Sequence, residues 1–207
     1  MIDPSAPYPR DLVGYGRTPP DPKWPGGARV AVQFVVNYEE GGENCLLHGD
    51  AASEAFLSEI IGAAPLEGAR NLNMESLYEY GARVGWWRLH RLFTERKLPV
   101  TVFAVGMALA RHPEAGAAMR EAGFEVASHG WRWIDYHGVE PAIEREHIRW
   151  SLDAIEQATG TRPVGWYTGR VSEHTRRLVV EQGELLYDAD SYADELPYWT
   201  YDFDRPH

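Results

Sequence analysis

The stretch RVAVQFVVNYEEGGE, residues 29–43, decides the fold class of this chain. Its nearly continuous run of Val and Phe is typical of a parallel strand that is buried on both faces, so we predict a strand over residues 29–37. Glu39 and Glu40 follow at once, and two glycines then let the chain turn away. An isolated acid pair usually faces solvent. However, sites in α/β proteins are built at the carboxyl ends of strands, so the pair is also a candidate wall of a site.

Strand and helix patterns alternate along the rest of the chain. Further strands are predicted over residues 99–105, 124–130, 164–169 and 185–190, with helices over 76–97, 107–121, 140–158 and near 173–182. This alternation indicates parallel strands joined by right-handed crossovers. Residues 41–75 form a long insertion, which at that length is usually functional or partly helical. The Pro- and Gly-rich residues 1–28 are predicted to form an extended arm, and residues 29–207 a single catalytic domain.

Composition excludes several classes of partner. The chain has 207 residues with 20 Lys and Arg against 31 Asp and Glu, a net charge of −11. No basic cluster is present, which argues against nucleic acid and anionic membranes. A single cysteine, Cys45, excludes an internal disulfide, and there is no apolar signal segment or membrane-length stretch. We therefore expect a soluble, cytoplasmic protein that binds a small molecule.

Polar clusters follow four of the predicted strands. They are Glu39 with Glu40, Ser128 with His129, residues 167–170 and residues 188–194. Because parallel strands end at the same edge of a sheet, these clusters are predicted to gather into one site.

The order of these clusters resembles the polysaccharide deacetylase superfamily, whose members hydrolyse amide bonds on a distorted α/β barrel. GYGRTPPDPKWPGGARVAVQFVVNYEEGGEN, LHGD, NLNMESLYEYGARVGWWRL and ASHGWRWIDYHG are most similar to the metal-independent allantoinases. The resemblance implies a distorted (β/α) barrel that opens the hydantoin ring of allantoin to allantoate in purine breakdown. Barrels of this superfamily have more than five strands, so the resemblance also implies a domain that is incomplete at its C-terminus. An exposed sheet edge would favour a homo-oligomer.

The metal-binding pattern of the superfamily is altered in this chain. Metal-dependent deacetylases carry an Asp-Asp pair, in which the first acid is the base and the second a metal ligand, and a His-x-x-x-His stretch. The corresponding positions here hold Glu39, Glu40, His129 and Trp133. An indole ring has no lone pair for a metal, and one carboxylate with one imidazole is a poor divalent site. The sequence therefore predicts no metal and no cofactor.

The resemblance suggests catalytic roles for three residues. Glu39 would activate water as general base, with Glu40 as the other candidate. His129 would orient the water or carry the proton, although a histidine at a strand end can simply bond a backbone carbonyl. Arg170 would offset negative charge on the substrate oxygen. The alternative for Arg170 is a structural pairing with Asp188 or Asp190.

Five further residues are predicted to contact substrate. Glu40 would hold a substrate N–H, and Trp131 or Trp133 would stack on a flat ring unless both are core residues. Tyr167 and Asp190 complete the set because they follow the fourth and fifth strands.

Two other functions stay open at this point. One is a metal-dependent polysaccharide deacetylase acting on chitin or peptidoglycan, which the altered metal pattern disfavours. The other is a non-catalytic fragment or binding protein, which the early end of the chain allows.

Overall fold

The computed structural model describes residues 8–201, 203 and 205–207, and the chain divides into two units. Residues 1–32 form the first unit, and residues 33–207 form the second. The described part of the first unit contains one short 3-10 helix, Pro25–Gly27, and no other helix or strand. The sequence placed this boundary four residues earlier, after residue 28.

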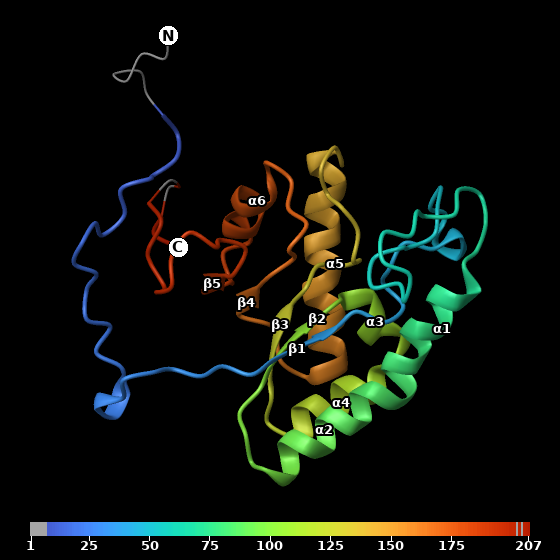
Figure 1. Ribbon diagram of the computed structural model, residues 1–207, viewed down its shortest axis with the longest axis horizontal. Helices are drawn as coiled ribbons and strands as arrows, with labels where there is room; N and C mark the ends of the chain where they lie inside the picture. The colour runs from blue at the N-terminus through green and yellow to red at the C-terminus, as the bar shows by residue number, and fades with distance from the viewer. Residues whose placement is uncertain (1–7, 202, 204) are drawn as a thin grey trace. The chain divides into compact units, whose positions relative to one another are not determined.

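A five-stranded parallel sheet is the centre of the second unit (Figure 1). Its strands lie side by side in chain order: β1 (Val35–Tyr38), β2 (Thr101–Ala104), β3 (Glu125–Ser128), β4 (Gly165–Trp166) and β5 (Tyr187–Asp188). The predicted α/β class with parallel strands is therefore confirmed. Among the described residues the sheet does not close into a barrel, because β1 and β5 each have a neighbouring strand on one side only.

The strands are shorter than predicted, and the prediction for the first strand was wrong in two respects. The first strand begins at Val35 rather than at Arg29, and its exposed residues include Val35 and Asn37. As an edge strand, β1 has a single paired neighbour and is not buried on both faces. The apolar run alone could not distinguish an edge strand from a central one.

Two predicted helices are each divided into separate elements. The structure has α1 (Leu72–Tyr80), a π-helix (Gly81–Gly85), α2 (Trp86–Glu95), α3 (Gly106–Arg111), α4 (Pro113–Glu121), α5 (Pro141–Thr159) and α6 (Thr175–Gln182). The break between α3 and α4 is explained by Pro113, whose ring and missing N–H cannot continue a helix but suit the first turn of a new one.

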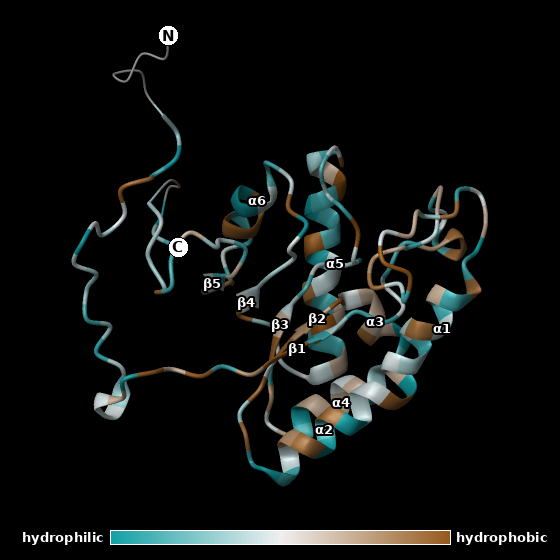
Figure 2. Cartoon of the chain, viewed as in Figure 1, coloured by the Kyte–Doolittle hydropathy of each residue, from teal (hydrophilic) through white to brown (hydrophobic). Residues whose placement is uncertain are grey.

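Alternation along the strands separates two faces of the sheet. On β2, Val102 and Ala104 are fully buried in the main core, together with Leu109 of α3 and Met119 of α4. Phe103 points to the opposite face, because successive side chains alternate. Brown and teal bands along α2 and α5 show the matching amphipathic helices that cover the core (Figure 2). The sheet thus has one face that is covered by helices and an opposite face, to which Phe103 points.

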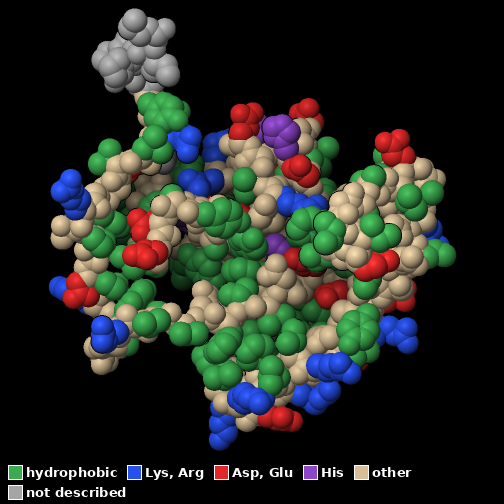
Figure 3. All heavy atoms as spheres, viewed as in Figure 1, with side chains coloured by type: hydrophobic (Ala, Val, Ile, Leu, Met, Phe, Trp, Pro, Cys, Tyr) green, Lys and Arg blue, Asp and Glu red, His purple; other side chains and the backbone are tan. Residues whose placement is uncertain are grey.

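In the part of the chain that the structure describes, no helix is long and apolar enough to cross a bilayer. On the face of the molecule drawn in Figure 3, acidic and basic side chains are interspersed rather than separated.

Candidate active site

The register of the sheet brings the predicted site residues into one row. The final residues of the five strands are paired across the sheet: Tyr38, Ala104, Ser128, Trp166 and Asp188. Tyr38 and Trp166 belong to the cores under the helices, and Ser128 bonds Ser151 of α5 at 2.8 Å, so the residue that follows each of these three faces the other way. Glu39, His129 and Tyr167 are such next residues. The sequence had predicted this gathering at the carboxyl edge, and the register provides it.

Glu39 and His129 form a buried pair. The Nε2 atom of His129 lies 2.9 Å from Oε1 of Glu39, and both residues are buried. The same Oε1 atom accepts a hydrogen bond from Nδ2 of Asn37 at 2.9 Å. Among the described residues, none donates to Oε2 of Glu39. One oxygen of this carboxylate is therefore fixed, and the other is available to a ligand or to water.

The second ring nitrogen of His129 fixes where its proton lies. Nδ1 is 2.8 Å from the carbonyl oxygen of Tyr167, and a carbonyl only accepts, so Nδ1 carries a hydrogen. A single further proton then forms the hydrogen bond between Nε2 of His129 and Oε1 of Glu39. The ring of His129 is also held by stacking on Tyr167, at a centroid distance of 5.1 Å and an interplanar angle of 5°. Phe103 packs on the tyrosine at 4.8 Å. The imidazole is therefore held in one orientation.

Arg170 and Trp133 form a second part of the site. The guanidinium carbon of Arg170 lies 3.7 Å from the ring centroid of Trp133, a close cation–π contact. Phe56 of the insertion contacts the same indole at 5.5 Å, and Glu54 lies 3.6 Å from Nη1 of Arg170. The structural alternative for Arg170 was a pairing with Asp188 or Asp190, and that pairing is wrong. Arg170 pairs with Glu54 instead.

The two aspartates have other partners. Asp188 lies 3.4 Å from Arg176. Asp190 accepts hydrogen bonds from the indole of Trp166 at 3.2 Å and from the backbone N–H groups of Thr168 and Gly169 at 3.0 and 2.6 Å. Burial raises the pKa of Asp190, although these N–H donors oppose the shift. Asp190 therefore shapes the loop that carries Tyr167 and Arg170.

Arg132 connects the insertion to the site. This buried side chain donates to Asp50 at 2.8 Å and to the carbonyl oxygen of Glu43 at 2.9 Å. Burial raises the pKa of Asp50, but hydrogen bonds from Arg132 and from the N–H of Cys45 outweigh it, so the pKa lies below its usual value. The pairing holds the beginning of the 41–71 segment beside Trp133, on the side of the molecule where α1 lies (Figure 1).

Glu40 lies on the other side of the chain from Glu39. Its Oε2 accepts the N–H of Glu39 at 3.0 Å, and its carboxylate lies against the π-helix, where a Cβ on Gly81 would meet Oε1 at 2.1 Å. Glu40 lines a hollow of about 550 Å³ between β1 and α1. Burial raises its pKa to about 7. The structure therefore does not bring the two predicted acids together.

Trp131 is also placed apart from the pair. It packs edge-on against Trp150 of α5 at 5.9 Å and lies beside Gly106, on the helix-covered side. Of the two tryptophans, only Trp133 stands beside Arg170.

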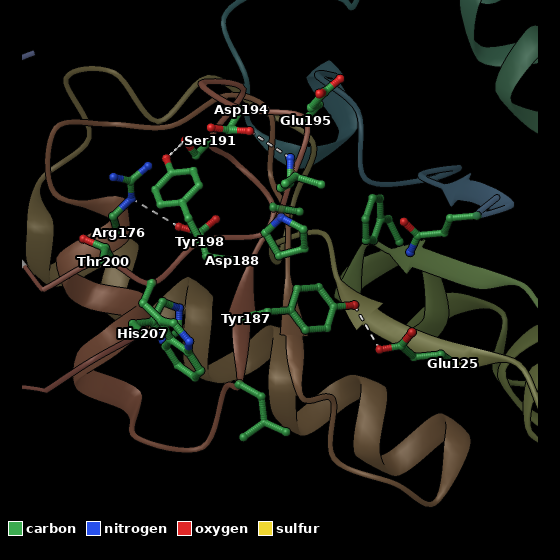
Figure 4. Close-up of a pocket in the computed structure, with 17 residues that line it drawn as sticks. Glu125, Arg176, Tyr187, Asp188, Ser191, Asp194, Glu195, Tyr198, Thr200 and His207 are labelled. Atoms are coloured by element: carbon green, nitrogen blue, oxygen red, sulfur yellow. Dashed lines mark hydrogen bonds and ion pairs between the residues drawn. The ribbon is translucent and has the colours of Figure 1, made fainter. Parts of the chain in front are cut away.

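A second hollow, of about 650 Å³, lies beside β5 (Figure 4). Its walls include Tyr187, whose hydroxyl donates to Glu125 at 3.0 Å, and the Arg176–Asp188 pair. Phe103 contributes from the middle of the sheet. The hollow therefore borders the same face as His129, although neither Glu39 nor His129 lines it.

The donor set does not fit the divalent metal of the metal-dependent deacetylases. Glu40, at the position of their ligand acid, points away from His129, and Trp133 replaces their second histidine. The guanidinium on Trp133 would repel a cation. Within residues 8–201, 203 and 205–207, no group of three His, Cys, Asp or Glu side chains could hold a metal ion. These side chains therefore do not form the divalent-metal site of the metal-dependent deacetylases.

Three residues of the site were not singled out in the sequence: Glu54, Phe56 and Arg132. Glu54 and Phe56 lie in the insertion, where no periodic pattern predicts which side chain turns inward. The length of the insertion was the available signal. For Arg132, the signal was its position between the two tryptophans after the third strand.

Comparison with known proteins gives a consistent assignment. The profile of the polysaccharide deacetylase family matches residues 74–188, more than half of the chain. A protein of Schizosaccharomyces pombe whose name assigns it to the polysaccharide deacetylases is 45% identical over 202 residues, which is 93% of this chain and 63% of that protein. This chain thus spans less than two thirds of that relative.

Two solved structures share both sequence and fold with the chain. The crystal structure of PuuE allantoinase is 56% identical, with a TM-score of 0.93 over 98% of this chain and 68% of that one. A "probable Polysaccharide deacetylase" from Pseudomonas aeruginosa PAO1 is 58% identical, with a TM-score of 0.92 over 97% of this chain and 67% of that one. With the family profile and this open parallel sheet, these matches make the assignment: the chain belongs to the polysaccharide deacetylase family.

Proposed function

We propose that this chain carries a hydrolytic site for the C–N bond of a cyclic amide, and that its substrate is allantoin, opened to allantoate. The observation that carries the proposal is the buried Glu39–His129 pair, together with the Arg170 guanidinium on the face of Trp133. A polysaccharide deacetylase of the metal-dependent kind would have a ligand at the position of Trp133. The likeness to PuuE allantoinase supports the same substrate class.

The proposed reaction begins at the free oxygen of Glu39. Oε2 takes a proton from water, and the water oxygen adds to a ring carbonyl carbon. The carbonyl oxygen becomes negatively charged, and Arg170 offsets this charge. The ring C–N bond then breaks, and the leaving nitrogen takes the proton from Glu39. His129, fixed through Nδ1, keeps Glu39 oriented and holds the proton at Nε2 while the carboxylate acts as base.

Replacing Glu39 with glutamine tests the base. Glu39→Gln preserves the size of the side chain but removes a basic oxygen, so allantoin turnover should fall by at least about a hundredfold. The assay is allantoate formation, with circular dichroism to confirm the fold. Glu40→Gln is the matched comparison. Loss of turnover in Glu40→Gln, with normal turnover in Glu39→Gln, would assign the base to Glu40.

Chelation tests the second candidate function, which the name of the Pseudomonas aeruginosa relative favours. We expect allantoin hydrolysis to survive chelators and not to rise with added zinc, cobalt or manganese. Acetate release from acetylated chitin or peptidoglycan fragments is measured in parallel. Metal-dependent acetate release without allantoin hydrolysis would replace the proposal with a deacetylase.

A further inference from the structure

Tyr78 of α1 has a buried hydroxyl that is left unpaired. The residue is 8% exposed, and no described residue forms a hydrogen bond with its oxygen. Two other buried tyrosines are satisfied, since Tyr38 bonds His112 at 2.7 Å and Tyr136 bonds His147 at 3.0 Å. A buried polar group without a partner is destabilising, so such groups are rare and often functional.

Tyr78 contacts residues of the candidate active site, and it also lines the hollow that holds Glu40. The ring of Tyr78 contacts the indole of Trp133, with centroids 6.3 Å apart, and that indole carries the Arg170 guanidinium on its face. Burial raises the pKa of Tyr78 above its ordinary range. The carboxylates of Glu54 and Glu39 raise it further, and Arg170 opposes them. The phenol therefore stays protonated and keeps a hydrogen that it can donate to an acceptor.

We propose that the Tyr78 hydroxyl is a substrate-binding donor that holds a carbonyl oxygen of the cyclic ureide. The inference rests on the proposed function and names a further contact for it. A ureide alternates carbonyl oxygens with N–H groups. Tyr78 and Arg170 offer donors to the carbonyl oxygens, whereas Oε2 of Glu39, which has no donor among the described residues, is an acceptor for an N–H group.

We expect a ligand to reach the hydroxyl by displacing a side chain of the insertion. The Tyr78 oxygen is shielded from solvent, the Tyr78 ring contacts Trp133, and Phe56 packs on the same indole at 5.5 Å. Phe56 is 58% exposed and lies outside the sheet and helices, so it can be displaced at little cost. Entry of the ring would replace the Phe56–Trp133 contact with ring stacking on Trp133.

Tyr78→Phe removes the hydroxyl and keeps the ring. We expect the dissociation constant for hydantoin, measured by calorimetry, to rise about tenfold. The KM for allantoin should rise similarly, with kcat within about threefold. The melting temperature should not fall, because no protein partner is lost. Tyr80→Phe, on the exposed side of the same helix, is the matched control and should leave all four values unchanged.

The outcomes separate the two proposals. If wild type neither binds hydantoin nor hydrolyses allantoin, the proposed function fails and this contact fails with it. If wild type does both and Tyr78→Phe binds equally well, only the role of Tyr78 is overturned. A lowered melting temperature with unchanged hydantoin affinity would likewise assign Tyr78 a purely structural role.

Discussion

Replacing Glu40 with glutamine should stabilise the protein at neutral and alkaline pH but not in acid. Burial raises the pKa of this carboxyl from 4.5 to about 7, opposed by hydrogen bonds from its own N–H and that of Glu39. Nearby carboxylates of Glu39 and Glu43 add to the rise. The folded protein therefore keeps a proton on Glu40 across a range of pH in which the unfolded chain has already released it.

The sign of the effect follows from this difference in bound protons. Between pH 4.5 and about 7 the folded state binds more protons at Glu40 than the unfolded state does. The free energy of unfolding therefore falls as pH rises through this window and is level above it. The shift corresponds to a loss of up to about 3 kcal/mol. Glutamine cannot ionise, and its amide oxygen can still accept the N–H of Glu39, so Glu40→Gln should recover most of this loss at pH above about 7.

Chemical denaturation of wild type and Glu40→Gln at a series of pH values measures the difference directly. Other titrating groups cancel in the comparison. Glu79→Gln is the control, because Glu79 lines the same hollow but its side chain is 63% exposed and lies 4.0 Å from Arg83. We expect Glu79→Gln to change stability by less than about 1 kcal/mol at every pH. A Glu40→Gln effect that is independent of pH, or destabilising at alkaline pH, would refute the reasoning.

Two further substitutions test the arginines of the site. Arg170→Lys should lower kcat/KM for allantoin by about tenfold or more with little change in melting temperature, because an ammonium lacks the planar fork that lies on Trp133 and meets a carbonyl. Steady-state kinetics measures this, and wild-type kinetics in Arg170→Lys would move the oxyanion role to another donor. Arg132→Met should reduce the free energy of unfolding by about 3 kcal/mol, since it leaves the partly buried Asp50 without its partner. Chemical denaturation measures this loss, and Arg132→Met with wild-type stability would show that the insertion is held by other contacts.

The gathering of Glu39, His129 and Tyr167 was predictable because it depends on strand order and on the carboxyl ends of parallel strands alone. Apolar runs mark the strands, and helices between them require parallel pairing. Each polar residue that directly follows such a run must lie at the same edge. The predicted gathering holds even where the predicted strand bounds are wrong by several residues, as they are for β1, which begins at Val35.

Other features depend on tertiary contacts that no short stretch encodes. The Glu40 carboxylate lies against Gly81, which has no Cβ to fill that space and begins the π-helix between α1 and α2. The helical spacing of residues 76–97 gives no sign of that interruption. In the insertion, Glu54 is fixed by Asn44 at 2.9 Å and by backbone N–H groups that follow it. Such contacts within a loop follow no sequence periodicity, so the sequence does not predict them.

The exchange of a histidine for Trp133 is linked to the placement of Arg170. An imidazole at this position would hold a cation through a lone pair, whereas an indole can hold one only on its face. The face of Trp133 is occupied by the guanidinium at 3.7 Å, and Glu54 balances its charge from 3.6 Å. The positive charge at this position thus belongs to an arginine side chain and not to a bound cation. The loop that carries this arginine is held by its hydrogen bonds to Asp190. An amide hydrolase needs positive charge near the developing oxyanion and a base near the water. With Arg170 for the first and Glu39 for the second, the described side chains of this site can meet both requirements.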